Sequence, residues 1–348
     1  MSGNSRYRIL FAGTPDTAVP SLDALVGAGF TIAAVLTRPD ALVGRKRVLT
    51  PSPVAARAAE LGLPILRASR LTGDAGRETL GRIAALDLDA AAVVAYGALV
   101  PAAGLEMPRH GWVNLHFSLL PAYRGAAPVQ HAVIDQAAQT GACVFQLEEG
   151  LDTGPVFSRL ERDLQPGETS GAVLADLAVS GAELLANTMG AILTGTATAE
   201  PQRGEPSLAP KLNQADGFVD AARPAAAVAA RINGTTPEPG AWALLEMASA
   251  PAEEAGERPA QQRVKLLGAV PEELPEGTAD LPLGDPLPGH LHRGRTAVHL
   301  QCADGTVRLV QVQPAGKKPM SAADWARGLP EGTRFQAEAT AETATEGP

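Results

Sequence analysis

Cysteines, basic residues and long hydrophobic runs are all scarce in this sequence, and each shortage excludes a class of protein. Among 348 residues there are two cysteines, Cys143 and Cys302, far apart and without the paired spacing of a zinc site or a redox motif. We therefore expect buried, reduced thiols and no metal centre. A formal net charge of −9 argues against broad nonspecific nucleic-acid binding, because phosphate contacts require positive potential, but a local basic patch stays possible.

Membrane attachment is also disfavoured by the sequence. No apolar run approaches the ~20 residues needed to cross a bilayer, and residues 1–8 lead into a predicted strand without a hydrophobic signal region. The apolar fraction of 45% and the charged fraction of 19% are typical of a soluble globular protein. We expect a cytoplasmic protein, long enough for two domains that each bury a core.

The first half of the chain alternates predicted strands and helices. Residues 7–13 are an apolar run ending in glycine, residues 16–28 carry apolar residues at helical spacing, and residues 31–37 are a second apolar run. A strand–helix–strand beginning predicts a parallel, doubly wound sheet. The remaining predicted strands are 63–66, 88–95, 112–115, 141–147 and 154–163, and the remaining helices are 52–61, 74–86, 128–135 and 170–193.

The second half is predicted to form a smaller domain. Residues 194–207 contain Thr, Gly and Pro and are interpreted as a linker, so the first domain is expected to end near residue 205. Beyond it, strands recur at intervals typical of a small barrel. The predicted helix is 223–232, and the strands are 241–247, 263–267, 296–302 and 307–313. The Pro-, Glu- and Gly-rich residues 250–290 predict long irregular excursions. The predicted domains are 1–205 and 206–334, followed by a disordered tail over 335–348.

Two polar side chains interrupt an otherwise buried predicted strand. Asn114 and His116 lie on the same side of an extended chain because they are separated by one residue. Asp152 follows the next predicted strand, within the segment Gly150 to Gly154. An amide donor, an imidazole and a carboxylate together suit the transfer of an acyl carbon. Considered one at a time, Asn114 and His116 are also explained as buried hydrogen-bonding residues, and Asp152 is also explained as a turn residue.

Positive charge is concentrated in one long loop, residues 38–51. The loop carries Arg38, Arg45, Lys46 and Arg47 in an otherwise acidic chain. Loops of this length inside a compact domain are often functional. The loop is therefore either a solvated basic segment or a clamp for the phosphates of a polyanionic substrate.

Several motifs together resemble the formyltetrahydrofolate-dependent formyltransferase family. The signature consists of Asn114-Leu115-His116, Ser118-Leu119-Leu120-Pro121 and Gly150 to Gly154. Further motifs are similar to the methionyl-tRNA-specific branch of that family. These are Phe11 to Asp16, the basic loop with Thr50 to Pro53, Ala95-Tyr96-Gly97, Arg124 to Pro128, Ala209 to Leu212 and Pro239 to Trp242. They follow the family's order along the chain up to about residue 334.

The resemblance implies a fold and a reaction. The implied fold is α/β, with a Rossmann-like, mostly parallel sheet in the formyltransferase domain and a small OB-like β-barrel after it. The implied reaction transfers the formyl group of 10-formyltetrahydrofolate to the α-amine of methionyl initiator tRNA, without a metal. Asn114 would stabilise the oxyanion, His116 would assist as a cation or exchange a proton, and Asp152 would orient the imidazole and favour its protonated form.

Binding residues follow from the same resemblance. The folate co-substrate is expected at Ser118, Leu119, Leu120, Pro121, Tyr96 and Gly97. The tRNA acceptor end is expected at Arg38, Arg45, Lys46 and Arg47, with the C-terminal barrel on the RNA body. The expected partners are thus folate and initiator methionyl-tRNA, and we expect the protein to be a monomer.

Other functions stay open on the sequence alone. A formyltransferase acting on glycinamide ribonucleotide or an amino sugar would share the catalytic residues but needs neither the basic loop nor a second domain. A hydrolase that releases formate would use water in place of the amine. A catalytically silent RNA-binding module is disfavoured by the intact catalytic set. A nicotinamide dehydrogenase is disfavoured because the turn Gly13-Thr14-Pro15 lacks the full Gly-x-Gly-x-x-Gly fingerprint.

Overall fold

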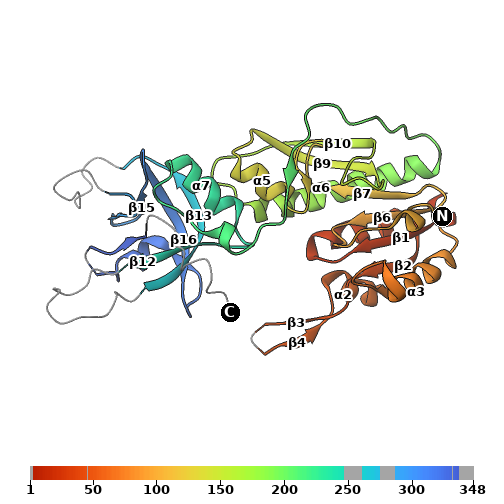
Figure 1. Cartoon of the computed structure of the whole chain (residues 1–348), viewed down its shortest axis with the longest axis horizontal. Helices are drawn as coiled ribbons and strands as arrows, with labels where there is room; N and C mark the ends of the chain where they lie inside the picture. Colours follow the sequence, from red (N-terminus) through yellow and green to blue (C-terminus); the bar gives the residue numbers. More distant parts are fainter. Residues whose placement is uncertain (1–2, 45, 247–260, 275–286, 331, 337–348) are drawn as a thin grey trace. The chain divides into compact units, whose positions relative to one another are not determined.

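The chain folds into two compact units, which we describe separately (Figure 1). The structure is a computed structural model that describes residues 3–44, 46–246, 261–274, 287–330 and 332–336. The first unit draws on residues up to 128, 139–162 and 174–209. The second unit draws on 129–138, 163–173 and the chain from residue 210 onward. The chain therefore passes between the units several times.

A seven-stranded sheet forms the centre of the first unit, with the strand order β10-β9-β7-β6-β1-β2-β5. Strands β5, β2, β1, β6 and β7 run parallel to their neighbours in this order, whereas β9 runs antiparallel to β7. The strands are β1 (Arg8–Gly13), β2 (Thr31–Thr37), β5 (Ile65–Arg67), β6 (Ala90–Val94), β7 (Trp112–His116), β9 (Gln139–Gln146) and β10 (Val156–Asp163). This sheet confirms the predicted Rossmann-like, mostly parallel fold.

Helices begin close to where the sequence predicted them. The Ser52 hydroxyl accepts a hydrogen bond from the backbone N–H of Ala55 at 3.0 Å, and Pro53 occupies the first turn of α2. The helices in the described residues are α1 (Val19–Gly27), α2 (Pro53–Glu60), α3 (Gly73–Ala84), α4 (Ala102–Leu105), α5 (Pro128–Ile134), α6 (Ser170–Leu193), α7 (Ala225–Gly234) and α8 (Ala322–Ala326), with 3-10 turns at Gly3–Arg6, Asp16–Ala18 and Ala215–Gly217.

Helix α6 is long and apolar enough, by length and composition, to cross a bilayer. Half of its most apolar 18-residue window is nevertheless buried inside the fold. A Cβ atom added to Gly181 would lie 3.1 Å from the Leu115 side chain of β7, so the helix lies directly on the sheet. We interpret α6 as a core helix of the first unit.

The basic loop, residues 38–51, contains a short hairpin that the sequence analysis did not predict. Strand β3 (Ala41–Val43) pairs antiparallel with β4 (Val48–Thr50), and Figure 1 shows the hairpin extending away from the central sheet. Four of its aliphatic side chains are more than half exposed, namely Leu42, Val43, Val48 and Leu49. The hairpin thus offers both apolar flanks and cations to solvent.

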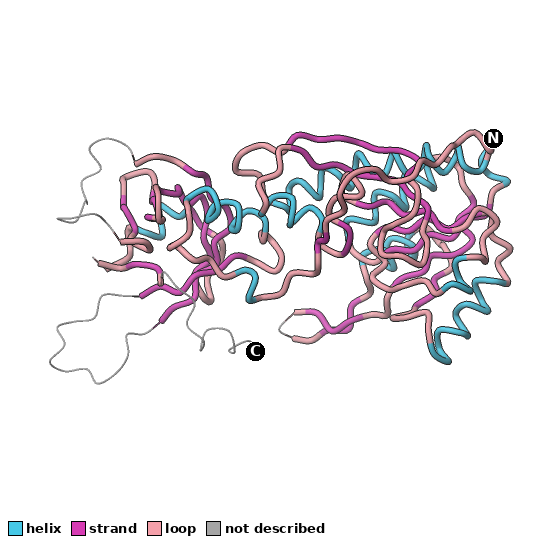
Figure 2. The backbone as a smooth tube through the Cα atoms, turned by 45° about the horizontal axis from the view of Figure 1, so that its top comes forward, coloured by secondary structure: helices cyan, strands magenta, loops and turns pink. Residues whose placement is uncertain are grey.

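The second unit is built around an antiparallel sheet, with the order β14-β15-β16-β13-β12-β18 and β17 paired to β16. Its strands, magenta in Figure 2, are β12 (Ala241–Glu246), β13 (Gln261–Pro271), β14 (Leu291–Arg293), β15 (Val298–Gln301), β16 (Thr306–Pro314), β17 (Met320–Ser321) and β18 (Arg334–Phe335). Residues before β14 meet β18, because the Phe335 N–H donates to the Gly289 carbonyl at 2.8 Å. The nearly closed barrel confirms the predicted second fold.

Two expectations about the second half need correction. Phe335 was placed in a disordered tail, yet it lies in β18, is 1% exposed and stacks on Trp325 at 5.9 Å between ring centroids. Phe335 is buried because β18 pairs with β12 on one side and with Gly289 on the other, which closes the barrel around its side chain. Strand β13 also runs over Gln261–Pro271, longer than the predicted 263–267, within a segment expected to be largely irregular. The rest of the predicted tail, from residue 337, lies outside the described residues.

The two cysteines match the prediction, since both Cys143 and Cys302 are free thiols and buried. Burial raises the pKa of both thiols, that of Cys302 to about 12. Because the thiolate is the reactive form, neither sulfur is a nucleophile at neutral pH.

Candidate active site

The order of the strands places a topological switch point at the carboxyl ends of β1 and β6. Strands β2 and β5 continue the sheet on one side of β1, and β6 and β7 continue it on the other, so the chain reverses its direction of winding between β1 and β6. Open α/β sheets bind ligands at such a switch point. The loops after these strands are tied together, because the Thr14 hydroxyl donates to the Tyr96 carbonyl at 2.8 Å.

Asn114 and His116 both lie on β7, which pairs in parallel with β6 and so lies near this switch point. Leu115 lies against Gly181 of α6, so the alternating residues on either side of it occupy the opposite face of the sheet. Asn114 is half-buried, and its side-chain amide has no hydrogen-bond partner within the described part of the chain. The amide is therefore available to donate to a ligand.

His116 is held by a backbone carbonyl. Its side chain is 6% exposed, and Nε2 lies 2.9 Å from the carbonyl oxygen of Tyr123. A carbonyl oxygen can only accept, so Nε2 must carry the proton and, in the neutral ring, Nδ1 carries the lone pair. Nδ1 lies 3.9 Å from Oδ2 of Asp152. The structure therefore leaves a basic nitrogen beside a carboxylate.

Burial and charge act in opposite directions on this imidazole. Burial is the larger effect and lowers the pKa of His116 below its ordinary value, while the Asp152 charge and the Tyr123 carbonyl raise it in part. His116 is consequently neutral at pH 7. A proton that reaches Nδ1 would be stabilised by the adjacent carboxylate.

Asp152 is fixed by its own contacts. Its Oδ2 atom accepts a hydrogen bond from the Gly125 N–H at 2.7 Å, and its side chain is 13% exposed. A separation of 3.9 Å from the imidazole is beyond hydrogen-bond range. The ring is thus oriented by the Tyr123 carbonyl, a residue that the sequence analysis did not single out, and Asp152 acts on the ring through its charge.

The predicted folate stretch mainly shapes the turn after β7. Ser118 is fully buried, and its hydroxyl donates to the Ala122 carbonyl at 2.6 Å, so it is not a free donor. Leu120 is buried in a cluster with Cys143 and Phe145. Pro121 is buried as well, whereas Leu119 is only half-buried. Of these residues, Leu119 keeps the most surface for a ligand.

The predicted contact at Tyr96 needs correction for its side chain. The ring is 1% exposed and its hydroxyl donates to the Ala68 carbonyl at 2.8 Å. Desolvation raises the pKa of Tyr96 to about 12. The adjacent Gly97 is exposed, in a left-handed turn at φ +83°, so this turn offers backbone rather than the phenol.

The predicted cationic residues divide into two groups. Arg38 donates to the Gly97 carbonyl at 3.0 Å, which brings it to the turn after β6. Lys46 and Arg47 are exposed on the hairpin. Arg45 lies outside the described residues.

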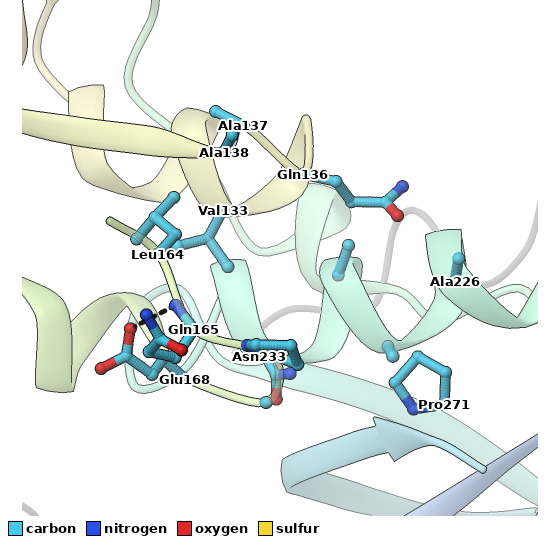
Figure 3. Close-up of a pocket in the computed structure, with 14 residues that line it drawn as sticks. Val133, Gln136, Ala137, Ala138, Leu164, Gln165, Glu168, Ala226, Asn233 and Pro271 are labelled. Atoms are coloured by element: carbon cyan, nitrogen blue, oxygen red, sulfur yellow. Dashed lines mark hydrogen bonds between the residues drawn. The ribbon is translucent and has the colours of Figure 1, made fainter. Parts of the chain in front are cut away.

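A separate cavity of about 280 Å³ lies in the second unit, between α5, α7 and residues 164–168 (Figure 3). Asn233 in its wall exchanges two hydrogen bonds with the backbone of Ala269, at 2.8 and 3.0 Å. The Glu168 carboxylate accepts from the Gln165 N–H at 2.9 Å. The amide of Asn233 and the carboxylate of Glu168 are thus both engaged in holding backbone groups, which favours a packing space over a reaction site.

The part of the chain that the structure describes contains no candidate metal site. Within those residues, no group of three or more His, Cys, Asp and Glu side chains is arranged to hold an ion. The polar groups described above, from Asn114, His116 and Asp152, are an amide, an imidazole and one carboxylate.

Comparison with known proteins identifies the family. Residues 6–189 match the family described as formyl transferase, and residues 211–330 match its formyl transferase C-terminal domain. The chain belongs to the formyl transferase family.

Similar relatives span almost the whole chain. The methionyl-tRNA formyltransferase of Arthrobacter sp. (strain FB24) is 54% identical over 321 residues, which is 92% of this chain and 96% of the relative. The methionyl-tRNA formyltransferase of Leifsonia xyli subsp. xyli (strain CTCB07) is 51% identical over 321 residues, covering 92% and 97% of the two chains.

Solved structures share the fold at low identity. WlaRD, a sugar 3N-formyl transferase solved with dTDP and 5-N-formyl-THF, has a TM-score of 0.58 at 13% identity, over 90% of this chain and 99% of that one. HypX from Aquifex aeolicus in complex with tetrahydrofolic acid has a TM-score of 0.60 at 15% identity, over 93% and 47%. These similarities support the fold described above.

Proposed function

We propose that this protein transfers the formyl group of 10-formyltetrahydrofolate to the α-amine of methionyl initiator tRNA, giving formylmethionyl-tRNA for translation initiation. The observation that carries the proposal is the 54% identity to a methionyl-tRNA formyltransferase, which runs over 92% of the chain and so includes both units. The free amide, basic imidazole nitrogen and carboxylate at the end of β7 are the groups that such a transfer needs.

The reaction exchanges one carbon–nitrogen bond for another. The α-amine of the methionyl group attacks the formyl carbon, and the carbonyl oxygen gains negative charge as the new bond forms. The Asn114 amide donates a hydrogen bond to that oxygen. Collapse then breaks the bond between the formyl carbon and N10 of the folate. The proton lost by the amine ends on N10, so tetrahydrofolate leaves and no other reactant is consumed.

His116 carries the proton between the two nitrogens. It is neutral at pH 7 with its lone pair on Nδ1, because burial lowers its pKa and Tyr123 holds the proton on Nε2. It accepts the amine proton at Nδ1 and becomes a cation, which Asp152 stabilises at 3.9 Å. It then donates that proton to the departing N10.

The folate is proposed to lie along the turn after β6 and the turn after β7. Gly97 in the first turn is exposed, which supports contacts from the backbone to the pterin ring. Leu119 contributes apolar surface, while Ser118, Leu120 and Pro121 hold the second turn in shape. Tyr96 contributes its backbone alone, because its side chain belongs to the core.

The tRNA is proposed to meet the basic hairpin. The exposed cations Lys46 and Arg47, together with Arg45, which precedes them in the sequence, suit phosphate groups. The exposed aliphatic residues of the hairpin suit unpaired bases. Arg38, hydrogen-bonded to the turn after β6, is proposed to act closer to the acceptor end. The barrel is proposed to contact the RNA body. We further propose that the protein is a cytoplasmic monomer.

The proposal is tested by supplying 10-formyltetrahydrofolate together with initiator methionyl-tRNA, elongator methionyl-tRNA or glycinamide ribonucleotide in parallel. Selective formyl transfer to the initiator tRNA is the expected result. Transfer only to the small amine would keep the catalytic assignment and overturn the tRNA assignment. Release of formate in the absence of any acceptor would make the protein a hydrolase.

A further inference from the structure

The two groups that face His116 both belong to residues with left-handed backbones. Tyr123, whose carbonyl binds Nε2, has φ +59°, and Asp152, whose carboxylate lies by Nδ1, has φ +51°. This region is rarely occupied by residues other than glycine, and it is least common for large side chains such as tyrosine. Such conformations persist where the surroundings hold them, and they often occur at functional sites.

The backbones of Tyr123 and Asp152 are held by residues 200–209, which we call the connector. The sequence predicts a linker over 194–207, which includes most of this stretch, but in the structure residues 200–209 belong to the first unit. Glu200 exchanges two backbone hydrogen bonds with Val156, just beyond the Asp152 loop. At the other end, β11 (Leu208–Ala209) pairs in parallel with β8 (Arg124–Gly125). The connector thus runs along the loops that carry both neighbours of His116.

Gln202 holds the Asp152 loop through hydrogen bonds to its backbone. Its Nε2 donates to the carbonyl of Asp152 at 2.7 Å and to the carbonyl of Gly154 at 2.9 Å. Its Oε1 accepts from Nη2 of Arg124 at 2.7 Å. Both the nitrogen and the oxygen of the Gln202 side-chain amide are therefore engaged in hydrogen bonds. Gln202 is also half-buried, whereas the residues on either side of it in the chain are exposed.

Ser207 holds the other neighbour of His116. Its hydroxyl accepts from the Tyr123 N–H at 2.9 Å, and its carbonyl accepts from the Arg124 N–H at 2.8 Å. These bonds flank the left-handed peptide whose carbonyl binds the imidazole. One segment, far along the chain, therefore fixes both the carbonyl and the carboxylate that face the catalytic ring.

We propose that Gln202 and Ser207 are positioning residues for formyl transfer, which hold Asp152 and Tyr123 where they set the orientation and the proton affinity of His116. Neither residue touches the reacting atoms. The proposal rests on the function proposed above for its kinetic readout, but its structural part concerns the imidazole and is measured without any substrate.

The kinetic test compares Gln202→Ala and Gln202→Glu with wild type. Alanine removes every contact, whereas glutamate keeps the acceptor for Arg124 and cannot donate to the two carbonyls. We expect kcat to fall about 10-fold to 100-fold in both variants, with KM for folate and for tRNA within about 3-fold, because a displaced catalytic group costs rate rather than binding. Glu205→Ala, an exposed change in the same connector, is the matched control and should retain wild-type kcat.

The test that needs no substrate follows the His116 imidazole by NMR as the pH is varied. Because the Asp152 charge raises the pKa of His116, loosening its loop should lower that pKa toward the value in Asp152→Asn. Gln202→Ala should therefore shift the titration to lower pH, and Glu205→Ala should not. An unshifted titration in a folded Gln202→Ala protein would overturn the proposal. If the wild-type protein formylated no amine, the function proposed above would be wrong. The titration would still test the positioning role of Gln202.

A double-mutant cycle separates positioning from a general loss of stability. If Gln202 acts through Asp152, then Gln202→Ala should cost less than about 3-fold in kcat when Asp152→Asn is already present. Full additivity of the two losses would overturn the proposal. For Ser207, alanine should lower kcat and threonine, which keeps the hydroxyl acceptor, should restore it. A threonine variant as slow as the alanine variant, with an unchanged melting temperature, would exclude Ser207 from this role.

Discussion

Single atoms decide the chemistry of this site. Nε2 of His116 is occupied by the Tyr123 carbonyl, and Nδ1 is left with a lone pair next to Asp152. The Asn114 amide has no partner in the part of the chain that the structure describes. The site is thus arranged so that one group donates to an oxyanion and another exchanges a proton.

Loss of the Asn114 amide should slow the chemical step. In Asn114→Ala the developing oxyanion loses a donor, so kcat for formyl transfer should fall by about 10²–10³ while KM changes little. Asn114→Asp, which is nearly isosteric but replaces the donor with an acceptor, should be at least as slow. Steady-state kinetics with initiator methionyl-tRNA measure this, with the melting temperature as a check on folding. Wild-type rates in both variants would remove Asn114 from the mechanism.

The pH dependence of the rate follows from the burial of His116. Burial lowers its pKa below the ordinary 6.5, so the neutral, proton-accepting form dominates at pH 7 and is lost only as the pH falls through that lowered pKa. We expect His116 to give kcat/KM an acidic limb below pH 6.5. Asp152→Asn removes a charge that raises this pKa, so this limb should move to lower pH while the rate above it drops. A limb that moved to higher pH would contradict the assignment.

Among the secondary-structure elements, the shortest strands were not predicted from the sequence. The hairpin of β3 and β4 and the closing strand β18 are two or three residues each, too short for an alternating pattern to show in the sequence. Helix α6 was predicted well because its apolar residues recur at helical spacing, and β6 because it lies in a continuous apolar run. Elements set by a few long-range pairings therefore escape prediction from local pattern.

Closure of the barrel should depend on Phe335. Truncation in Phe335→Ala leaves a space beside Trp325 and removes a large apolar contact, so the free energy of unfolding of the second unit should fall by about 3–5 kcal/mol. Phe335→Leu should cost much less because it keeps most of the volume. Urea unfolding followed by tryptophan fluorescence measures the change. An unaltered midpoint in Phe335→Ala would show that β18 does not hold the barrel closed.

At the scale of the whole molecule, charge is distributed unevenly. The chain carries a net charge of −9, yet exposed cations gather on the basic hairpin. A polyanionic RNA is repelled by the average charge and attracted by this patch. Binding of the tRNA should therefore depend on few cations and should be sensitive to salt.

Removal of the hairpin cations should weaken the salt dependence of tRNA binding. In the double variant Lys46→Ala/Arg47→Ala, KM for tRNA should rise, and the slope of log kcat/KM against log salt should become shallower by about 1.5, as expected for two lost phosphate contacts. KM for folate should not change. Arg77→Ala/Arg82→Ala, which removes the same charge from exposed positions on α3, is the control. Equal slopes in both double variants would contradict a contact at the hairpin.

Apolar periodicity and short motifs are local properties of the chain, so they were enough to predict the two fold classes and the three polar residues proposed for catalysis. The folded chain was needed to show that Tyr96 is a core residue, that Tyr123 orients His116, and that Gln202 supports the Asp152 loop. Each of these depends on a hydrogen bond from a side chain to a backbone carbonyl. Every residue has such a carbonyl, so no residue type marks the partner, and only the folded chain brings the two groups together.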